Sequence, residues 1–421
     1  MSGIGSEYVC TFGDPLISFL YSPANLPPMG RQFRFIHCAD LHLGSRFKGL
    51  GTENPALAER LRQSVFGSFS RIIDAALENH VDALVISGDL YDDDNELPST
   101  RMWLSEQLAR LDVPVFICRG NHDSRTSWDS AIPYPSNVHE FGTAPERVEL
   151  SEDVEIVGIS YAVPHETRNL ASILEGSFDR FTIACLHCDL DTVTEGYSYA
   201  PCSMSDLQSG NIDYWALGHI HKRDIVATGP YVVYPGNIQG RSFKETGPKG
   251  AYLVTVDSHR VSSIDFIETS IYHWEDLTVD ITGRTFNDVM NIIGSKADPE
   301  AICRITFTGS GELDTLLRTN VDDVSRTIAQ TAGCMISSLA VRTSPPIDIE
   351  ARSNEKDMGA AVIRSGRELS KMTKEELVDL ICQNKNASKH RDFFMSMSEE
   401  DVQSLVDDAT RSILARMVVS R

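Results

Sequence analysis

Short apolar runs alternate along the first part of the chain with longer segments whose apolar side chains recur every three or four positions. The apolar runs predict buried strands at residues 33–38, 83–86, 113–118, 181–186 and 214–217. Between them, residues 57–80 and 99–111 have the spacing of amphipathic helices. Strands that alternate with helices are typical of a layered α/β domain, to which further strands at 250–256 and 264–267 are added.

A different pattern begins at residue 269 and predicts a small α+β module. Its predicted strands lie at residues 277–281, 302–308 and 337–341, and its predicted helices at 285–293 and 312–318. The adjacent prolines Pro345 and Pro346 break both helices and strands, so they mark the end of this module.

The tail of the chain is predicted to be helical from about residue 366. Thr373 and Glu376 have the spacing of a capping box at the start of a helix. Ser398 begins a second helix, with Val402 and Leu405 among the residues of its apolar side. Helices this short bury little core of their own. We therefore expect the tail to dock either onto the rest of this chain or onto a helix of a partner.

These patterns divide the chain into an N-terminal extension, two domains and a tail. The boundaries are residues 1–30, 31–268, 269–345 and 346–421. The Pro-rich stretch 23–28 of the extension leads directly to Met29 before the first predicted strand. Two interpretations of the extension stay open: a disordered arm, or an artefact of start-site choice.

Side chains that bind metals follow each of the first five predicted strands. The clusters are Asp40 and His42 in CADLHLGS, Asp89 in SGDLYD, Asn121 in RGNHD, His187 in CLHCD, and His219 and His221 in LGHIH. Sites in layered α/β sheets form beyond the carboxyl ends of the strands, so we expect these clusters to meet. Gly88, Gly120 and Gly218 stand beside the ligands and allow tight turns that direct the side chains inward.

The mixture of imidazole, carboxylate and amide ligands suits manganese, iron or zinc better than the oxygen-only shells of magnesium and calcium. Two such ions about 3.5–4 Å apart hydrolyse phosphoesters by acidifying a shared water and by holding the attacking and leaving oxygens. The sequence therefore predicts a two-metal phosphoesterase centre.

Asp89 is the candidate for the carboxylate that bridges the two ions. The shell of one ion is then completed by Asp40, His42 and His221. The shell of the other is completed by Asn121, which offers a neutral carbonyl oxygen, His187 and His219. His122 is left over, either as the proton donor to the leaving oxygen or as a contact that stabilises the transition state.

Each cluster alone has an ordinary structural interpretation. A single Asp-x-His at a strand end is more often a turn than a metal site, and it is the series of five clusters that favours the metal centre. The histidines outside the clusters are predicted to be structural or surface residues. Cys185 and Cys188 have the spacing of a redox or zinc motif, but no second pair completes a structural zinc site, so we expect them to pack beside the metals.

Composition narrows the class of protein. No apolar run reaches the roughly 18 residues that suggest a membrane span. Nine cysteines, scattered among predicted core strands, favour reduced thiols and a cytoplasmic protein. The formal net charge of −22 argues against broad electrostatic attraction to nucleic acid. Two bound cations would add about +4 within the cleft, and a partner could carry most of the DNA-binding surface.

The five clusters give the chain a resemblance to the calcineurin-like metallophosphoesterases, and specifically to their SbcD and YhaO branch of DNA repair nucleases. The branch is indicated by the segment YPGNIQGR at residues 234–241, which is similar to the family's PGS-x-x-x-R. The family's E-x-G-x-KG is matched by Glu245, Gly247, Lys249 and Gly250. The resemblance covers about residues 33–345, and only loosely the tail.

The resemblance implies a four-layer α/β/β/α sandwich with the small α+β domain as a cap over the cleft, followed by the helical tail. It implies metal ligands at Asp40, His42, Asp89, Asn121, His187, His219 and His221, with His122 as the catalytic histidine. It also implies two manganese ions, exonuclease activity often joined by endonuclease activity, and a homodimer. The implied partners are DNA as substrate and an SMC-like ATPase such as SbcC, with no membrane.

Two residues depart from the family pattern and one stays open. Asp92 stands where archaeal and eukaryotic relatives carry a histidine thought to assist exonuclease action, although bacterial SbcD-like chains tend to have Asp here. Asn237 replaces the more usual Ser. Arg241 is compatible both with a contact to a substrate phosphate and with a structural salt bridge.

The leading prediction is a metal-dependent DNA nuclease that acts in DNA repair. The alternative, which the acidic charge suggests, is a phosphodiesterase or phosphatase acting on small nucleotides or phosphoproteins. A non-enzymatic scaffold that recruits an ATPase through its tail is disfavoured by the complete ligand set. The sequence leaves open the polarity of cleavage, the preference for exo- or endonuclease action, the physiological metal and the preferred DNA end.

Overall fold

The computed structural model describes residues 32–45, 55–92, 97–124, 131–191, 198–346 and 349–419. The predicted N-terminal extension lies outside these residues. Two compact units divide the chain between His273 and Trp274.

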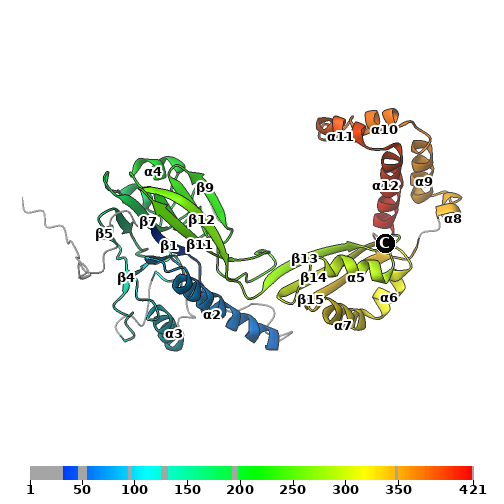
Figure 1. The fold of residues 1–421 in the computed structure, drawn as a ribbon. Coiled ribbons are helices and arrows are strands. Elements are labelled where there is room, and N and C mark those ends of the chain that lie inside the picture. The colour runs from blue at the N-terminus through cyan, green and yellow to red at the C-terminus, as the bar shows by residue number, and fades with distance from the viewer. Residues whose placement is uncertain are drawn as a thin grey trace, which may run out of the picture. The chain divides into compact units, whose positions relative to one another are not determined.

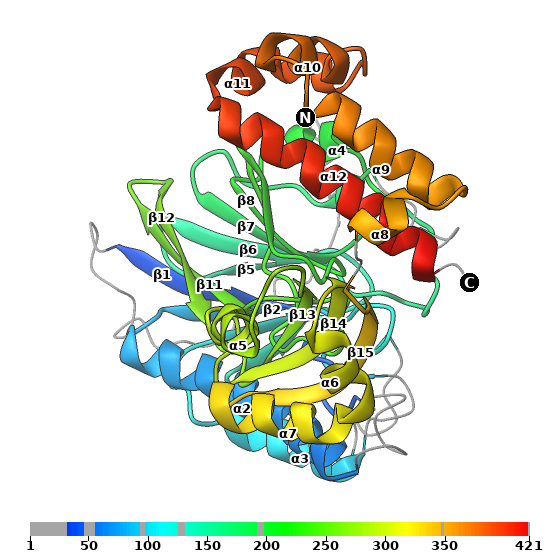
Figure 2. The ribbon, with the colours of Figure 1, turned by 90° about the vertical axis from the view of Figure 1, so that its right-hand side faces the viewer.

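The first unit contains two sheets that Figures 1 and 2 show in blue to green. One sheet consists of β1 (Phe33–Cys38), β2 (Ala83–Ser87), β3 (Val115–Cys118), β4 (Val138–Glu140), β11 (Gly250–Asp257) and β12 (Arg260–Glu268). The other consists of β5 (Glu146–Glu149), β6 (Val154–Gly158), β7 (Phe181–His187), β8 (Tyr214–Gly218), β9 (Asp224–Thr228) and β10 (Tyr231–Tyr234). Their strand orders are β12-β11-β1-β2-β3-β4 and β5-β6-β7-β8-β10-β9.

The central strands of both sheets run parallel. In the first sheet, β1 pairs with β2, β2 with β3 and β3 with β4 in parallel, while β11 closes on β1 in the antiparallel direction. In the second sheet, β6, β7, β8 and β10 are parallel neighbours. The carboxyl ends of β1, β2 and β3 therefore lie at one edge of the first sheet. Those of β7 and β8 lie at one edge of the second sheet.

The apolar runs are continuous because their strands are covered on both faces. Between the sheets lies a core to which the first sheet gives Phe35, Val85 and Phe116 and the second gives Ile156, Ile183 and Ala216. All six are almost fully buried. Each such large apolar side chain contributes about 1.5–3 kcal/mol relative to its exposed state.

Helices cover the outer faces of the two sheets. On the first sheet lie α2 (Pro55–Glu78) and α3 (Pro98–Leu108), joined by an edge-to-face contact of Phe66 and Trp103 with ring centroids 4.8 Å apart. On the second lies α4 (Met204–Ser209), where Trp215 Nε1 donates to the carbonyl of Leu207 at 2.9 Å. The four-layer α/β/β/α sandwich predicted above is thereby confirmed.

The second unit begins with a three-stranded sheet in the order β13-β14-β15. Its strands are β13 (His273–Asp280), β14 (Ala301–Ser310) and β15 (Met335–Ser344), and its helices are α5 (Phe286–Gly294), α6 (Leu313–Thr319) and α7 (Val321–Ala332). Phe307 and Ile305 of the sheet share a core with Ile293 of α5 and Ile328 of α7. Helix α7 is absent from the sequence prediction, because only Val324 and Ile328 are buried along its length.

The tail adds further helices to the same unit. They are α8 (Ile349–Ser353), α9 (Met358–Leu369), α10 (Lys374–Ile381), α11 (Arg391–Ser396) and α12 (Glu399–Val419). The start predicted at about residue 366 is wrong, because α9 already begins after Asp357, whose side chain accepts from the backbone of Ala360. The capping box of Thr373 and Glu376 is present. Helix α12 packs on α9 and contacts β14 and β15, so the tail docks onto its own unit.

Within the described ranges, no helix is both long enough and apolar enough to cross a lipid bilayer. This agrees with the absence of a long apolar run in the sequence.

Candidate metal centre

The strand ends of the first unit bring the predicted ligands to one place. Asp40, Asp89 and Asn121 follow β1, β2 and β3, His187 is the last residue of β7, and His219 and His221 follow β8. The register of these strands aligns Ser87 with Cys118, and His187 with Gly218. The two sheets are therefore the frame that holds the ligands.

Six of the seven predicted ligands form two groups of facing atoms. In one group, His221 Nε2 lies 3.1 Å from His42 Nε2 and 3.7 Å from Asp40 Oδ1. In the other, Asn121 Oδ1 lies 3.1 Å from both His187 Nε2 and His219 Nδ1. The ligand atoms of Asp40, His42 and His221 lie close enough together to hold one ion, and so do those of Asp89, His187 and His219. The division of the seven residues into two shells stays a prediction.

Asp89 lies between the two groups. Its Oδ2 is 3.9 Å from His42 Nε2 and 3.4 Å from His187 Nε2, so one oxygen faces both. The other oxygen, Oδ1, accepts from the backbone N–H of His122 at 3.0 Å. The side chain is almost fully buried. This position fits the bridging role that we predict for Asp89.

In the first group the Nε2 atoms of His42 and His221 face each other. His42 Nδ1 lies 2.5 Å from Asp92 Oδ1, and His221 Nδ1 lies 2.7 Å from Glu245 Oε1. A carboxylate accepts only, so in the neutral rings both Nδ1 atoms carry the hydrogen. The two Nε2 lone pairs then point at each other at 3.1 Å. Such an arrangement is repulsive unless a cation lies between them, which favours a metal ion here.

The second group follows the same logic with different atoms. His187 Nδ1 lies 2.9 Å from the carbonyl of Ser87, and His219 Nε2 lies 3.2 Å from Asp189 Oδ1. These acceptors hold a hydrogen on each of those atoms, so the nitrogens that face inward are His187 Nε2 and His219 Nδ1, 3.3 Å apart, and in a neutral ring each offers a lone pair. His219 therefore presents Nδ1 to the centre, whereas the other three rings present Nε2.

Burial and charge affect the two groups unequally. Burial lowers the pKa of His42 to about 4, which keeps this ring neutral and able to bind a metal. Burial also disfavours the charged form of His187, but the nearby Asp89 outweighs it and raises the pKa of His187 to about 10. A cation that binds His187 must therefore displace a proton, so metal binding at this group is coupled to proton release.

Four of the predicted ligands have a left-handed backbone, which non-glycine residues seldom adopt. The φ angles are 52° at Asp40, 45° at His42, 52° at Asp89 and 101° at His219. Such conformations cost on the order of 1 kcal/mol each or more, and they cluster at functional sites, where the surrounding structure enforces them. The concentration of this strain on the ligands supports the assignment.

The glycines beside the ligands are required for two different reasons. Gly88 has φ +87°, which agrees with the tight turn expected from the sequence. At Gly120 and Gly218 the reason is space rather than backbone freedom. A Cβ on Gly120 would lie 2.2 Å from Asp89 Oδ1, and one on Gly218 would lie 1.8 Å from the carbonyl of Ser87.

With this geometry in place, comparison with known proteins is informative. Residues 33–223 match the family model of the calcineurin-like phosphoesterases. This part of the chain is a calcineurin-like phosphoesterase domain. The family predicted from the sequence is confirmed.

Relatives extend beyond the matched domain. The uncharacterized metallophosphoesterase YhaO of Bacillus subtilis is 39% identical over 259 residues, which are 59% of this chain and 63% of that protein. The chain thus spans less than two thirds of that relative's length. The DNA double-strand break repair protein Mre11 of Sulfolobus acidocaldarius is 28% identical over 300 residues, 66% of this chain and 75% of that protein. A dimetal phosphatase structure from Danio rerio is 12% identical, covers 54% of this chain and 93% of that one, and has a TM-score of 0.37.

Charged residues around the predicted ligands hold these ligands in orientation. Arg241 Nη1 lies 3.3 Å from Asp92 Oδ1, and its backbone N–H donates to Glu245 Oε2 at 2.7 Å. Its Nη2 also lies 3.8 Å from Glu245 Oε1, so the guanidinium forms salt bridges with both carboxylates that orient His42 and His221. Asn237, which replaces the usual Ser, donates from Nδ2 to Glu245 Oε2 at 2.9 Å. Removal of such partners typically costs 10- to 100-fold in metal affinity.

Sequence reasoning missed the positioning roles of three carboxylates. Asp92 and Glu245 were noted only for their place in family patterns, and Asp189 was not singled out. Asp123 also escaped notice, although its carboxylate joins two ligand loops by accepting from the backbone of Leu90 and of Gly120, each at 2.7 Å. Burial raises the pKa of Asp123 to about 7. In the sequence, only position points to these four carboxylates, because each lies within a few residues of a predicted ligand or near the PGN segment.

His122 lies at the edge of the centre. Its ring packs edge-on against His42 with centroids 5.0 Å apart, and its Nδ1 is 3.8 Å from Asp92 Oδ1. One third of its side chain is exposed, so it can meet a substrate that enters from solvent. This placement is compatible with both roles predicted for His122, proton donor and transition-state contact.

Cys185 and Cys188 are buried free thiols in the phosphoesterase domain. Cys185 Sγ lies 3.6 Å from the carbonyl of Ile86, and Cys188 Sγ lies 3.7 Å from Cys202 Sγ. Their neighbours are thus core groups rather than each other. The contacts agree with the packing role expected from the sequence.

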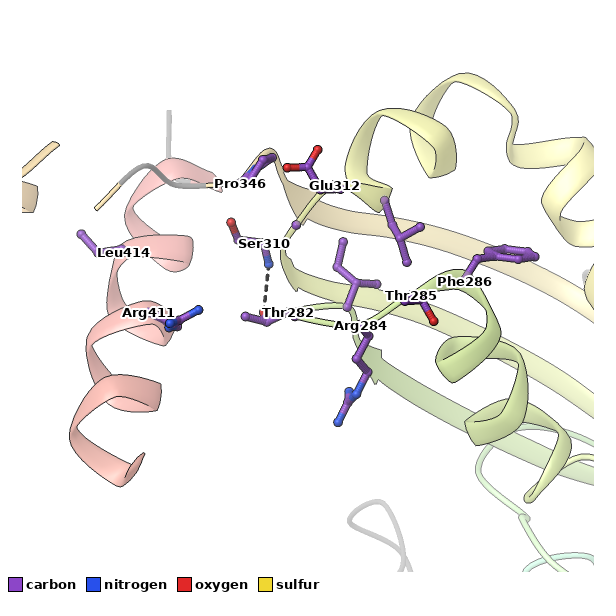
Figure 3. A pocket seen from close by; sticks show the side chains of 13 residues that line it. Thr282, Arg284, Thr285, Phe286, Ser310, Glu312, Pro346, Arg411 and Leu414 are labelled. Carbon is purple, nitrogen blue, oxygen red and sulfur yellow. Dashed lines mark hydrogen bonds between the residues drawn. The ribbon is translucent and has the colours of Figure 1, made fainter. Parts of the chain in front are cut away.

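A pocket of about 570 Å³ lies within the second unit. Figure 3 shows Arg411 and Leu414 of α12 on one side and the loop that carries Thr282 and Arg284 on the other. None of the predicted ligands lines it. We therefore place the candidate site at the predicted metal ligands and not at this pocket.

Proposed function

We propose that this chain is a metal-dependent nuclease that hydrolyses phosphodiester bonds in DNA. The observation that carries the proposal is the set of inward-facing ring nitrogens on four histidines around the single Asp89 oxygen that faces both groups. Asp40, His42 and His221 would hold one ion, and Asn121, His187 and His219 the other. We propose manganese as the metal, because the family that the chain resembles is usually manganese-dependent; the mixed nitrogen and oxygen ligands also suit iron or zinc.

Divalent cations bound here would supply a nucleophile at neutral pH and a sink for the charge of the phosphoryl oxygens. The residues of the chain set the conditions for that chemistry. Asp92, Glu245 and Asp189 keep three imidazoles in the tautomer that faces inward. Partial exposure and the contact with Asp92 suit His122 to deliver a proton to the leaving oxygen.

DNA is proposed as the substrate because of the relatives. Mre11 of Sulfolobus acidocaldarius is a DNA double-strand break repair protein by name, and its similarity extends past the phosphoesterase domain. The net charge of −22 opposes this assignment, since it disfavours general attraction to a polyanion. We therefore propose that binding depends on the centre itself and on a partner surface. A cytoplasmic location and a homodimer stay predictions.

The test is hydrolysis of an end-labelled linear duplex by the full chain with manganese. We expect cutting by the wild type and at least a hundredfold loss of rate in His122→Ala, because general acid catalysis typically contributes about 100- to 10,000-fold. The matched control is His390→Ala, a surface histidine of the second unit. Hydrolysis of a small diester in parallel reports on the metal centre. Cleavage of the small diester without any cutting of duplex or single-stranded DNA would contradict the proposal.

A second candidate function is supported by the acidic charge. A phosphodiesterase or phosphatase for small nucleotides or phosphoproteins needs the same two-metal centre but no basic surface. A panel of cyclic nucleotides and phosphopeptides separates this function from the first. Turnover of one panel member in the absence of DNA cleavage would establish it.

We further propose that the tail binds an SMC-like ATPase. Helices α9, α10 and α12 line an apolar groove of about 380 Å³. Its exposed apolar residues include Met358 at 70%, Ile413 at 47% and Leu380 at 39%. Exposed apolar surface of this kind is typical of a protein–protein interface. An apolar groove of this kind binds the apolar face of an amphipathic helix, which we propose for the partner.

Charge placed in the groove should remove the partner. Leu380→Glu with Ile413→Glu is expected to abolish co-purification of the ATPase and to leave small-diester hydrolysis intact. The control is Phe178→Glu, which alters a 95% exposed apolar residue of the first unit. Retained co-purification in the double variant would count against the groove as the docking element.

A further inference from the structure

Among the described residues, the rings of Tyr199 and Tyr161 lie beside the second group of ligands, and the ring of His122 lies beside the first. The ring of Tyr199 lies 5.1 Å from that of His219 at 45°, and the ring of His165 lies 5.2 Å from that of Tyr199 at 71°. His165 is exposed and Tyr199 is half-buried. The two rings thus form a continuous aromatic path from solvent to a predicted ligand.

Buried groups fix Tyr199 in this place. Its backbone N–H donates to Asp189 Oδ2 at 2.9 Å, and the other oxygen of Asp189 orients His219 at 3.2 Å. Asp189 is fully buried. One carboxylate therefore contacts both the ring of His219 and the backbone of Tyr199, so it links the two residues.

The neighbouring segments are also held together. Ala200 donates from its backbone to the carbonyl of Glu166 at 2.7 Å, which joins the segment of Tyr199 to that of His165. Ala200 has a φ of 43°, a left-handed conformation that a buried alanine adopts only under constraint. Glu166 is itself held by two bonds from Arg168, at 2.9 and 2.6 Å. Strain of this kind next to a candidate site indicates a conformation with a use.

The two ends of the centre differ in chemistry. Beside the first group lie the charged side chains of Asp92, Glu245 and Arg241. Beside the second lie the rings of Tyr199 and Tyr161, the latter 5.6 Å from His187. Tyr161 is fully buried, so Tyr199 is the ring of this pair that a substrate can reach beside the second group.

We propose that Tyr199, extended by His165, is a stacking surface for the nucleobase next to the scissile phosphate. The proposal rests on the proposed function only in requiring a substrate that contains nucleotides. Aromatic side chains bind bases of any sequence, because every base offers a π-face. Tyr199 would thus select nucleic acid over other phosphodiesters and place the end of the strand at the second group.

The competing explanation is that Tyr199 only supports His219, since it also packs on the outer core of the second sheet. An oligonucleotide with an abasic terminal nucleotide distinguishes the two. For the normal oligonucleotide we expect Tyr199→Ala to raise KM about tenfold, the effect typical of one lost stack, and Tyr199→Phe to retain wild-type KM. For the abasic oligonucleotide, wild type and Tyr199→Ala should differ less than about twofold, because there is no base to stack.

Equal losses on the normal and abasic oligonucleotides, together with reduced manganese content by elemental analysis, would overturn the proposal in favour of the supporting role. A calorimetric titration separates this inference from the proposed function. Manganese-loaded wild type should bind deoxyadenosine monophosphate about tenfold more tightly than deoxyribose 5-phosphate, and Tyr199→Ala should remove the difference. That result in a protein that does not cut DNA would refute the nuclease and keep the stacking surface. Equal affinities in the wild type would refute the stacking surface.

Discussion

Replacing Gly120 with alanine should disable the metal centre without disturbing the fold. Gly120 precedes Asn121 and has an ordinary backbone conformation, so alanine is not strained by φ. The added Cβ would instead lie 2.2 Å from Asp89 Oδ1 and 2.8 Å from His187 Nε2. Both neighbours are predicted ligands. The substitution therefore tests the geometry of the bridging carboxylate directly.

The required movement follows from these distances. Ordinary contact with a Cβ begins at 3.4 Å, so Asp89 Oδ1 must retreat by 3.4 − 2.2 = 1.2 Å and His187 Nε2 by 3.4 − 2.8 = 0.6 Å. Ligand atoms in a metal site tolerate deviations of about 0.2 Å. Both movements exceed this tolerance severalfold. Overpacking of one methyl group costs about 1–3 kcal/mol of stability, which a domain of this size can absorb.

The assay is manganese titration by calorimetry, with thermal unfolding measured on the same samples. We expect Gly120→Ala to bind manganese at least a hundredfold more weakly while it unfolds in a single cooperative transition. Gly294→Ala is the matched control, because Gly294 ends α5 and a Cβ there meets nothing within 4 Å. Unchanged manganese affinity in Gly120→Ala would refute the proposed position of Asp89 between the ions.

Three further predictions concern Asp92, which contacts a predicted ligand, the buried carboxylate of Glu155, and removal of the metal. Asp92→Ala should weaken manganese binding 10- to 100-fold, because His42 loses the partner at 2.5 Å that fixes its tautomer; an unchanged calorimetric affinity would exclude that role. Glu155→Gln should cost about 2 kcal/mol in urea unfolding at pH 7, since a fully buried carboxylate bonded to Arg147 and Thr182 loses its charge. Interactions with Ser177, Thr182 and Arg147 outweigh burial and lower the pKa of Glu155 in the folded protein. The stabilisation is therefore present above the unfolded pKa of about 4.3 and is lost as the pH falls below it. A cost of Glu155→Gln that does not change with pH would contradict the reasoning. Chelation should lower the unfolding temperature of the first unit, because free manganese at one hundred times its Kd adds about 2.7 kcal/mol; a melting temperature unaffected by chelator or added manganese would argue against bound metal.

The elements that the sequence predicted well are those whose pattern is local. Strands β1, β2 and β7 are buried on both faces, and therefore they appear as continuous apolar runs. Strand β9 was missed, because most of its residues are exposed at the edge of its sheet. Helix α7 was missed because its buried stripe is narrow.

The sequence by itself determined the family and the residues that gather at the centre, because each ligand lies within a few residues of the end of its own buried strand. Only the tertiary structure decided which atom of each predicted ligand faces the centre. That choice depends on hydrogen bonds between residues far apart in the chain, such as His42 with Asp92 and His187 with the carbonyl of Ser87. It also depends on the packing that places a single oxygen of Asp89 between His42 and His187. Local pattern follows from burial along one strand, whereas tautomer and ligand direction follow from contacts that exist only once the two sheets have come together.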